Sequence, residues 1–157
     1  MDINVVDTFR NVNFWSPFIA WLIAQLTKMT NAFLKTRKLD FRFLVSTGGM
    51  PSAHSAMVSG LATSIGINCG FKSPIFALGF AFALLTMFDA STVRRAAGEQ
   101  ARLLNEMVDE LFKEHRFSEI KLAELLGHTR LEVFLGMVMG ILVALLVNSA
   151  ASAMAVN

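Results

Sequence analysis

The stretch 132–156, EVFLGMVMGILVALLVNSAASAMAV, has one charged residue, Glu132, at its first position. An α-helix needs about 20 mainly apolar residues to cross the hydrocarbon core of a bilayer, and this stretch is long enough. Three earlier windows with few charges, 14–34, 54–71 and 73–88, resemble it. In the first of these, Lys28 lies near one end, where we expect its long side chain to snorkel to the membrane interface. We therefore predict an all-α integral membrane bundle of about four transmembrane helices, forming one domain over 1–157.

The composition of the whole chain excludes several other classes of protein. Only 17% of its residues are charged and 54% are hydrophobic, whereas soluble domains have about 25% charged residues. The same figures exclude disorder, and the single cysteine, Cys69, excludes a disulfide scaffold. The net charge of +2 is too small to indicate a nucleic-acid-binding protein.

Basic residues concentrate in two loops, one after the first window and one at 89–131. With four spans, both loops lie on the same side of the membrane. The positive-inside rule then places these loops in the cytoplasm and both termini outside. The first 13 residues lack the basic leader of a signal peptide, so we expect the first span to be retained. We expect a polar site on the cytoplasmic face of the cytoplasmic, or inner, membrane.

The loop 89–131 contains helical patterns of its own. Apolar residues recur at helical spacing over 92–114, with charged residues on the other faces, which predicts an amphipathic helix. A shorter helix is predicted to begin after Ser118 as N-cap and to end at Gly127 as C-terminal cap. Either helix can lie along the membrane surface or against the spans.

A glycine-containing turn precedes the second window, in the sequence STGGMPSAHS at 46–55. Gly48 and Gly49 permit close approach to the backbone, and a turn that leads into a helix N-terminus suits a bound anion. His54 would lie at the mouth of this anion site. The alternative is that Ser52 merely caps the helix and His54 rests at the membrane interface.

The sequence GHTRLE at 127–132 allows two interpretations. Thr129 and Glu132 have the T-x-x-E spacing of a capping box, which needs no catalysis to explain it. His128 and Glu132 are four residues apart, so they share a face if the helix starts slightly earlier. An imidazole oriented by a carboxylate can act as a base or as a nucleophile.

The sequence DASTVRRAAGEQ at 89–100 contains Arg94 and Arg95, which cannot both face one side of a helix. One of them is expected to point to a site, and the other to reach lipid phosphates or an acidic neighbour. Simple anchoring at the interface is the alternative. Because all three sequences fall on one side of the membrane, we predict a phosphoryl-transfer centre without a cofactor. The chain lacks the usual ligand spacings of a metal site.

Over about 35–140, these sequences resemble the divergent bacterial and plant branch of the type-2 phosphatidic acid phosphatase superfamily, which includes acid phosphatases and vanadium haloperoxidases. The family pattern is K-x6-R-P, then P-S-G-H, then S-R-x5-H-x3-D. The matching residues in this chain are Lys35, Arg42, Pro51, Ser52, His54, His128 and Glu132.

The chain departs from this pattern at several positions. Phe43 replaces the proline, Ala53 replaces the glycine, and Glu132 is a longer acid than the family's aspartate. The S-R pair would fall at Lys121 and Leu122, so the arginine that grips phosphate is absent there. Our hypothesis is that Arg94 or Arg95 replaces it from another helix.

The resemblance implies a metal-independent lipid phosphatase. In it, His128 would attack phosphorus to form a phosphohistidine, Glu132 would orient His128, and His54 would protonate the leaving alkoxide. Lys35, Arg42 and Ser52 would bind the phosphate oxygens, and by our own hypothesis one of Arg94 and Arg95 would join them. The turn at Gly48 and Gly49 is expected, from its own sequence, to contribute to the same anion site.

The implied substrates are phosphatidylglycerophosphate, phosphatidic acid, or a polyprenyl phosphate or diphosphate. A non-catalytic protein that binds phosphorylated lipids or partners, and a lipid phosphotransferase, are the alternatives. Gly136 and Gly140 form a G-x-x-x-G pattern, which suggests close helix packing and a possible homodimer that completes the site.

Overall fold

The computed structural model describes residues 6–37, 49–111 and 127–156, and within these ranges the chain forms six α-helices and no strand. The helices are α1 (Val6–Arg10), α2 (Val12–Thr36), α3 (Ala53–Cys69), α4 (Pro74–Ser91), α5 (Val93–Leu111) and α6 (Arg130–Val156). The predicted all-α fold is confirmed. Two helical stretches, Pro74–Val108 and Arg130–Ala155, are long and apolar enough to cross a membrane. The count of four spans stays a prediction.

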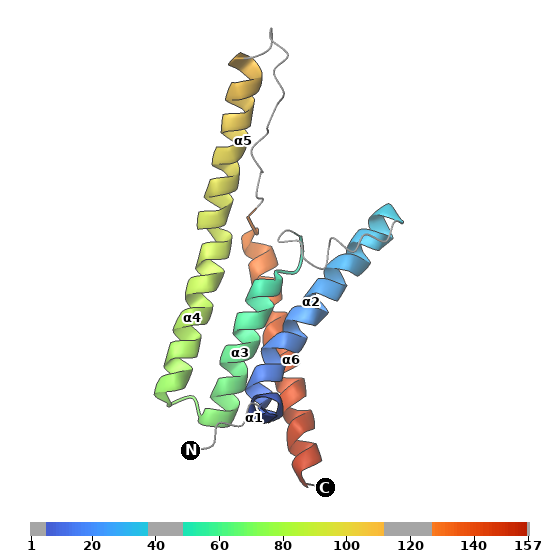
Figure 1. The fold of residues 1–157 in the computed structure, drawn as a ribbon, viewed down its shortest axis with the longest axis vertical. Coiled ribbons are helices and arrows are strands. Elements are labelled where there is room, and N and C mark those ends of the chain that lie inside the picture. The colour runs from blue at the N-terminus through green and yellow to red at the C-terminus, as the bar shows by residue number, and fades with distance from the viewer. Residues whose placement is uncertain (1–5, 38–48, 112–126, 157) are drawn as a thin grey trace.

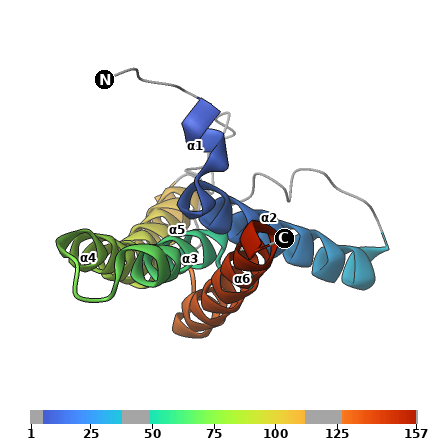
Figure 2. The ribbon, with the colours of Figure 1, turned by 90° about the horizontal axis from the view of Figure 1, so that it is seen from below.

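α3 is the central helix of the bundle. It packs against α6, α2 and α4, and α2 also packs against α6 (Figures 1 and 2). α2 runs antiparallel to α3, whereas α6 runs parallel to it, so the end of α2 and the starts of α3 and α6 lie at one end of the bundle (Figure 1). α4 turns large apolar side chains outward, and Leu78 is 70% exposed. An apolar surface of this kind suits lipid contact.

Small residues allow α6 to pack against α3 at very short range. A Cβ atom on Gly136 would collide with the backbone oxygen of Ser52, and one on Gly140 would collide with Ser59 Oγ and the backbone oxygen of Ala56. The G-x-x-x-G pattern therefore joins two helices of the same chain. Its surface is buried within the bundle, so a homodimer would have to use a different surface.

Polar side chains connect three helices at the opposite end of the bundle. The Nδ2 of Asn68 in α3 donates to Asn148 Oδ1 in α6 at 2.6 Å and to Asn13 Oδ1 in α2 at 3.0 Å. Ser64 Oγ also donates to Asn13 Oδ1, at 2.7 Å. Ser64 and Asn148 are buried. Hydrogen bonds of this kind hold helices together where water is scarce.

The predicted amphipathic helix at 92–114 corresponds to α5, which continues directly from α4. The backbone N–H of Thr92 donates to the Phe88 oxygen, and that of Ala96 donates to the Thr92 oxygen, so the helical direction persists. Figure 1 shows α5 extending the line of α4 beyond the bundle. Among the described helices, α5 packs only with α4 and does not lie against the other spans. The predicted helix after Ser118 lies outside the described residues, and only its proposed cap, Gly127, is described.

Replacing Gly140 with alanine tests the close packing of α3 and α6. We expect Gly140→Ala to lower the thermal unfolding temperature in detergent, because the new methyl group overlaps the α3 backbone and overpacking costs about 1–3 kcal/mol. Ala150→Val, which adds volume at an exposed position of α6, is the control and should unfold like the unmodified chain. Equal stability of the two variants would contradict the described packing.

Candidate functional site

The site is organised around Ser52, the N-cap of α3. Its Oγ accepts hydrogen bonds from the backbone N–H of Ser55 at 3.4 Å and from Ser55 Oγ at 2.9 Å. Its own backbone N–H donates to the backbone carbonyl oxygen of Glu132 at 3.0 Å. This bond joins the start of α3 to the first turn of α6. Ser52 is completely buried. The structure thus shows the capping role of Ser52, and its role in substrate binding stays a prediction.

The turn before α3 needs glycine at position 49. Gly49 has φ of +90°, a conformation that residues with a side chain rarely adopt. The chain then passes through Met50 and the buried Pro51 to Ser52. Gly48 lies outside the described residues, so the double-glycine anion site is described only in part.

His128 and Glu132 form a pair at the start of α6. His128 Nδ1 lies 3.2 Å from Glu132 Oε2, and the two side chains are 5% and 21% exposed. The same carboxylate oxygen accepts the backbone N–H of Thr129 at 2.9 Å, while Thr129 Oγ1 accepts the backbone N–H of Glu132 at 3.3 Å. The capping box and the oriented imidazole therefore coexist, because one carboxylate oxygen serves both.

The segment that carries His128 docks on the junction of α4 and α5. The backbone N–H of His128 donates to the Ala90 oxygen at 3.1 Å. Gly127 packs against the Arg95 backbone so closely that a Cβ atom there would collide with it. The predicted site sequences 127–132 and 89–100 are therefore in contact in the structure.

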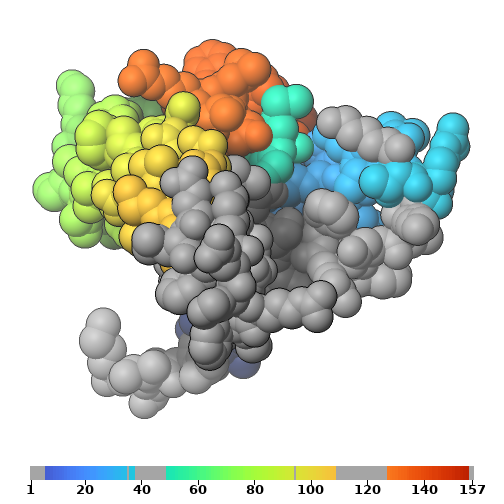
Figure 3. All heavy atoms as spheres, turned by 90° about the horizontal axis from the view of Figure 1, so that it is seen from above, coloured from blue at the N-terminus to red at the C-terminus, as the bar shows by residue number. Residues whose placement is uncertain are grey.

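The described part of the third predicted site sequence, 49–55, lies at the same end of the bundle. His54 is in the first turn of α3, two residues after Ser52, and is partly exposed. Seen from above, the start of α3 lies between α6 and α2 (Figure 3). The ends of three helices thus bring together the segments that carry both candidate catalytic histidines.

The predicted phosphate-binding cations are described only in part. Arg95 Nε donates to Glu99 Oε1 at 3.1 Å in a surface pair, and the Arg95 side chain is 55% exposed. Surface pairs of this kind contribute little to stability. The side chains of Arg94 and Lys35 lie outside the described residues, although their backbones belong to α5 and α2, and Arg42 lies outside them altogether.

The structure contradicts our prediction for the position of the Lys28 side chain. We expected it to snorkel to the interface, but the side chain is buried in the bundle and the residue is only 4% exposed. The Glu132 carboxylate lies within electrostatic range of the Lys28 ammonium group. The signal in the sequence was a lone charge inside an apolar window, which often marks a functional position in membrane helices.

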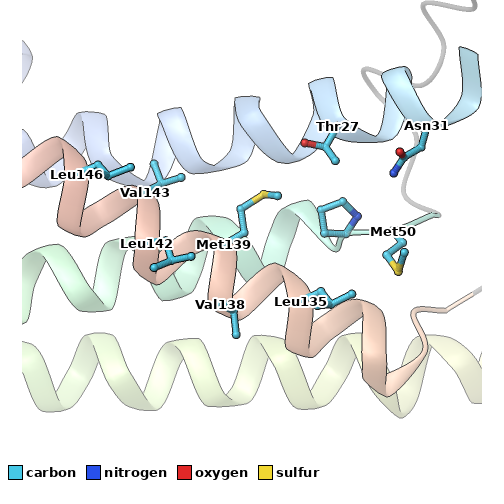
Figure 4. A pocket seen from close by; sticks show the side chains of 10 residues that line it. Thr27, Asn31, Met50, Leu135, Val138, Met139, Leu142, Val143 and Leu146 are labelled. Carbon is cyan, nitrogen blue, oxygen red and sulfur yellow. The ribbon is translucent and has the colours of Figure 1, made fainter. Parts of the chain in front are cut away.

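An apolar groove of about 480 Å³ runs between α2 and α6, starting beside the site (Figure 4). Thr27 and Asn31 of α2 line its wall opposite α6, and Met50 and Pro51 lie at the site end. The α6 side consists of apolar residues: Leu135, Val138, Met139, Leu142, Val143 and Leu146. From Leu135 to Leu146 the helix rises by about 16 Å, roughly the depth of one leaflet's hydrocarbon.

Within residues 6–37, 49–111 and 127–156, no group of three or more His, Cys, Asp and Glu side chains is arranged to hold a metal ion.

The fold and site define a helical, membrane-associated protein with polar chemistry at one end of its bundle. The chain belongs to the divergent PAP2 family, whose model matches residues 9–143. The resemblance inferred from the motifs is thereby confirmed. A relative named "Uncharacterized membrane protein YuiD", from Bacillus subtilis (strain 168), is 40% identical over 151 residues, covering 89% of this chain and 96% of that protein. No solved structure matches the chain.

Substitutions of Glu132 separate its two contacts. Glu132→Gln keeps a neutral oxygen for the Thr129 N–H, so we expect its unfolding free energy to stay near that of the unmodified chain. Glu132→Ala removes this acceptor and should cost about 1 kcal/mol, as loss of a capping side chain usually does. Thermal unfolding in detergent measures both, with Glu99→Ala as the control for an exposed carboxylate. A stable Glu132→Ala variant would show that the capping box contributes nothing.

Proposed function

We propose that this protein is a metal-independent phosphatase of the cytoplasmic membrane, which hydrolyses a lipid phosphomonoester or diphosphate through a phosphohistidine on His128. The observation that carries the proposal is the His128–Glu132 pair, in which the His128 side chain is buried and its Nδ1 lies 3.2 Å from Glu132 Oε2. This pair lies at the end of the bundle where the P-S-x-H segment begins α3.

The proposed mechanism assigns one task to each histidine. Glu132 holds the Nδ1–H of His128, so Nε2 on the opposite side of the ring carries the lone pair that attacks phosphorus. As the P–N bond forms, the P–O bond to the lipid alkoxide breaks, and His54 gives that alkoxide a proton. Water then attacks the phosphohistidine and gives a proton to His54, which releases phosphate and restores His128.

The apolar groove supports a lipid as the substrate. It begins beside Met50 and Pro51, which directly precede Ser52, and continues along α6 away from the site. A phosphate at the site would place an attached acyl or prenyl chain at the start of this groove. The lipid class we propose is phosphatidylglycerophosphate, phosphatidic acid, or a polyprenyl phosphate or diphosphate.

The orientation of the bundle is part of the proposal. The described ends of α2, α3 and α6 that surround the site belong to the side on which basic loop residues concentrate. By the positive-inside rule, this side faces the cytoplasm, and the substrate comes from the inner leaflet.

A second candidate is a protein that binds phosphorylated lipid without hydrolysing it. The observation that favours it is the surface pair of Arg95 with Glu99, since the one arginine of the 94–95 pair whose side chain is described does not point to the site. A phosphotransferase would use the same histidines and a different acceptor. Release of inorganic phosphate distinguishes the phosphatase from both alternatives.

Variants of the three histidines test the proposed catalysis. We expect purified protein to release phosphate from lipid phosphates in the presence of EDTA, and His128→Ala to lose this activity at least 10³-fold, on the order of effects for lost nucleophiles. His54→Ala should lose activity on lipid phosphates but much less on an aryl phosphate, whose leaving group needs no proton. His115→Ala is the control. Full activity of His128→Ala would refute the mechanism.

Charge on Glu132 is tested in the same assay. Glu132→Gln keeps a stable cap but removes the carboxylate that stabilises positive charge on His128, so we expect its phosphate release to fall at least tenfold. Unchanged activity would reduce Glu132 to its capping role.

Filling the groove tests the lipid assignment. Val138→Trp places a large side chain on the groove wall, and we expect it to raise KM for a long-chain lipid phosphate while leaving hydrolysis of a small aryl phosphate unchanged. Leu145→Trp, at an exposed position of α6 outside the groove lining, is the matched control. Equal losses for both substrates would argue against a chain in the groove.

A further inference from the structure

The packing of α2 on α3 determines which residue of α2 lies level with the site. A Cβ atom on Gly60 would lie 3.2 Å from Ala20 Cβ. One turn further along α2, Ala24 belongs to the same buried cluster as Ala53 and Ala56. Because the two helices are antiparallel, one more turn of α2 brings Lys28 level with Ser52, at the start of α3.

The same level of the bundle contains Glu132. Its backbone oxygen accepts the Ser52 N–H, and its carboxylate lies within electrostatic range of Lys28. Thr27 and Asn31, the neighbours of Lys28 on α2, line the groove that begins at Pro51. Lys28 of α2 therefore lies close to the start of α3 and to the first turn of α6, the two elements that carry the candidate catalytic residues.

The ammonium group of Lys28 has an unusual environment. The residue is 4% exposed, and within the part of the chain that the structure describes its side chain forms no hydrogen bond or ion pair. Removing an ammonium ion from water costs several kcal/mol unless hydrogen bonds and opposite charge replace the lost hydration. Glu132 supplies the opposite charge, but its Oε2 is already bonded to His128 and Thr129. The ammonium group thus has three N–H donors that can bind an anion at the site.

We propose that Lys28 binds the phosphoryl group of the substrate at this site, a task for which this chain lacks the arginine of the S-R motif. This inference rests on the proposed function, and it identifies Lys28 as the cation that binds the phosphoryl group in the proposed reaction. A phosphate dianion that approaches His128 also approaches the negative charge of Glu132. Lys28 offsets that repulsion and binds nonbridging oxygens as a compact point charge.

The test is binding of inorganic phosphate to the full chain in detergent, measured by calorimetry. We expect Lys28→Met to raise Kd about tenfold or more, as loss of a hydrogen bond to a charged group predicts. Lys28→Arg keeps the charge and should restore most of the binding. Lys72→Met, which removes an exposed lysine between α3 and α4, is the matched control and should leave Kd unchanged.

A purely structural role for Lys28 as counter-charge to Glu132 gives a different pattern. In that case Lys28→Met lowers the unfolding temperature, and the double variant Lys28→Met with Glu132→Gln restores it. Phosphate binding by the double variant would then match that of Glu132→Gln alone. If Lys28 binds phosphate, the stably folded double variant still binds it at least tenfold more weakly than Glu132→Gln.

The outcomes also separate this inference from the proposed function. If Lys28→Met binds phosphate as tightly as the unmodified chain, the assignment of Lys28 is overturned, while phosphatase activity that depends on His128 is unaffected. If His128→Ala retains full phosphatase activity but Lys28→Met loses phosphate binding, the catalytic mechanism fails and the assignment of Lys28 stands. Absence of phosphate binding by the unmodified chain overturns the assignment directly.

Discussion

The close approach of α3 and α6 is the constraint on which the site depends. With glycine at 136 and 140, the backbones come near enough for the Ser52 N–H to donate to the Glu132 oxygen at 3.0 Å. Because the two helices run parallel from this contact, their first turns lie together. The P-S-x-H and H-x3-E segments, about 75 residues apart in sequence, become neighbours as a result of the packing that stabilises the bundle.

The site then combines a small number of ionisable groups, two of them on the buried residues His128 and Lys28. One oxygen of Glu132 bonds both the His128 ring and the Thr129 backbone, so the start of α6 and the orientation of the imidazole are coupled. Lys28 lies within electrostatic range of the same carboxylate. In low-dielectric surroundings such interactions are stronger than in water.

Much of this arrangement was predictable from sequence, for reasons that are local. Apolar windows and capping residues predicted helices close to α3, α4 and α6, and the motifs predicted the family. Hydropathy averages do not record which way a side chain points, so Lys28 was placed at the interface rather than in the bundle. Likewise, the G-x-x-x-G spacing indicates a close helix contact without specifying the partner, which is α3 of the same chain. The sequence suggested either a capping box or an imidazole oriented by Glu132. Both occur, because a single carboxylate oxygen contacts the His128 ring and the Thr129 N–H, and residue spacing does not reveal such a shared contact.

The groove between α2 and α6 runs along α6 away from the site (Figure 4). If the groove holds a lipid chain, as we propose, a lipid that enters it from the side stays in the plane of the bilayer. The occupancy of the groove would therefore depend on the mole fraction of that lipid in the leaflet. Diluting the membrane with inert lipid would lower the occupancy, whereas diluting the suspension with water would not. Two-dimensional diffusion, rather than encounter from solution, would then supply the site.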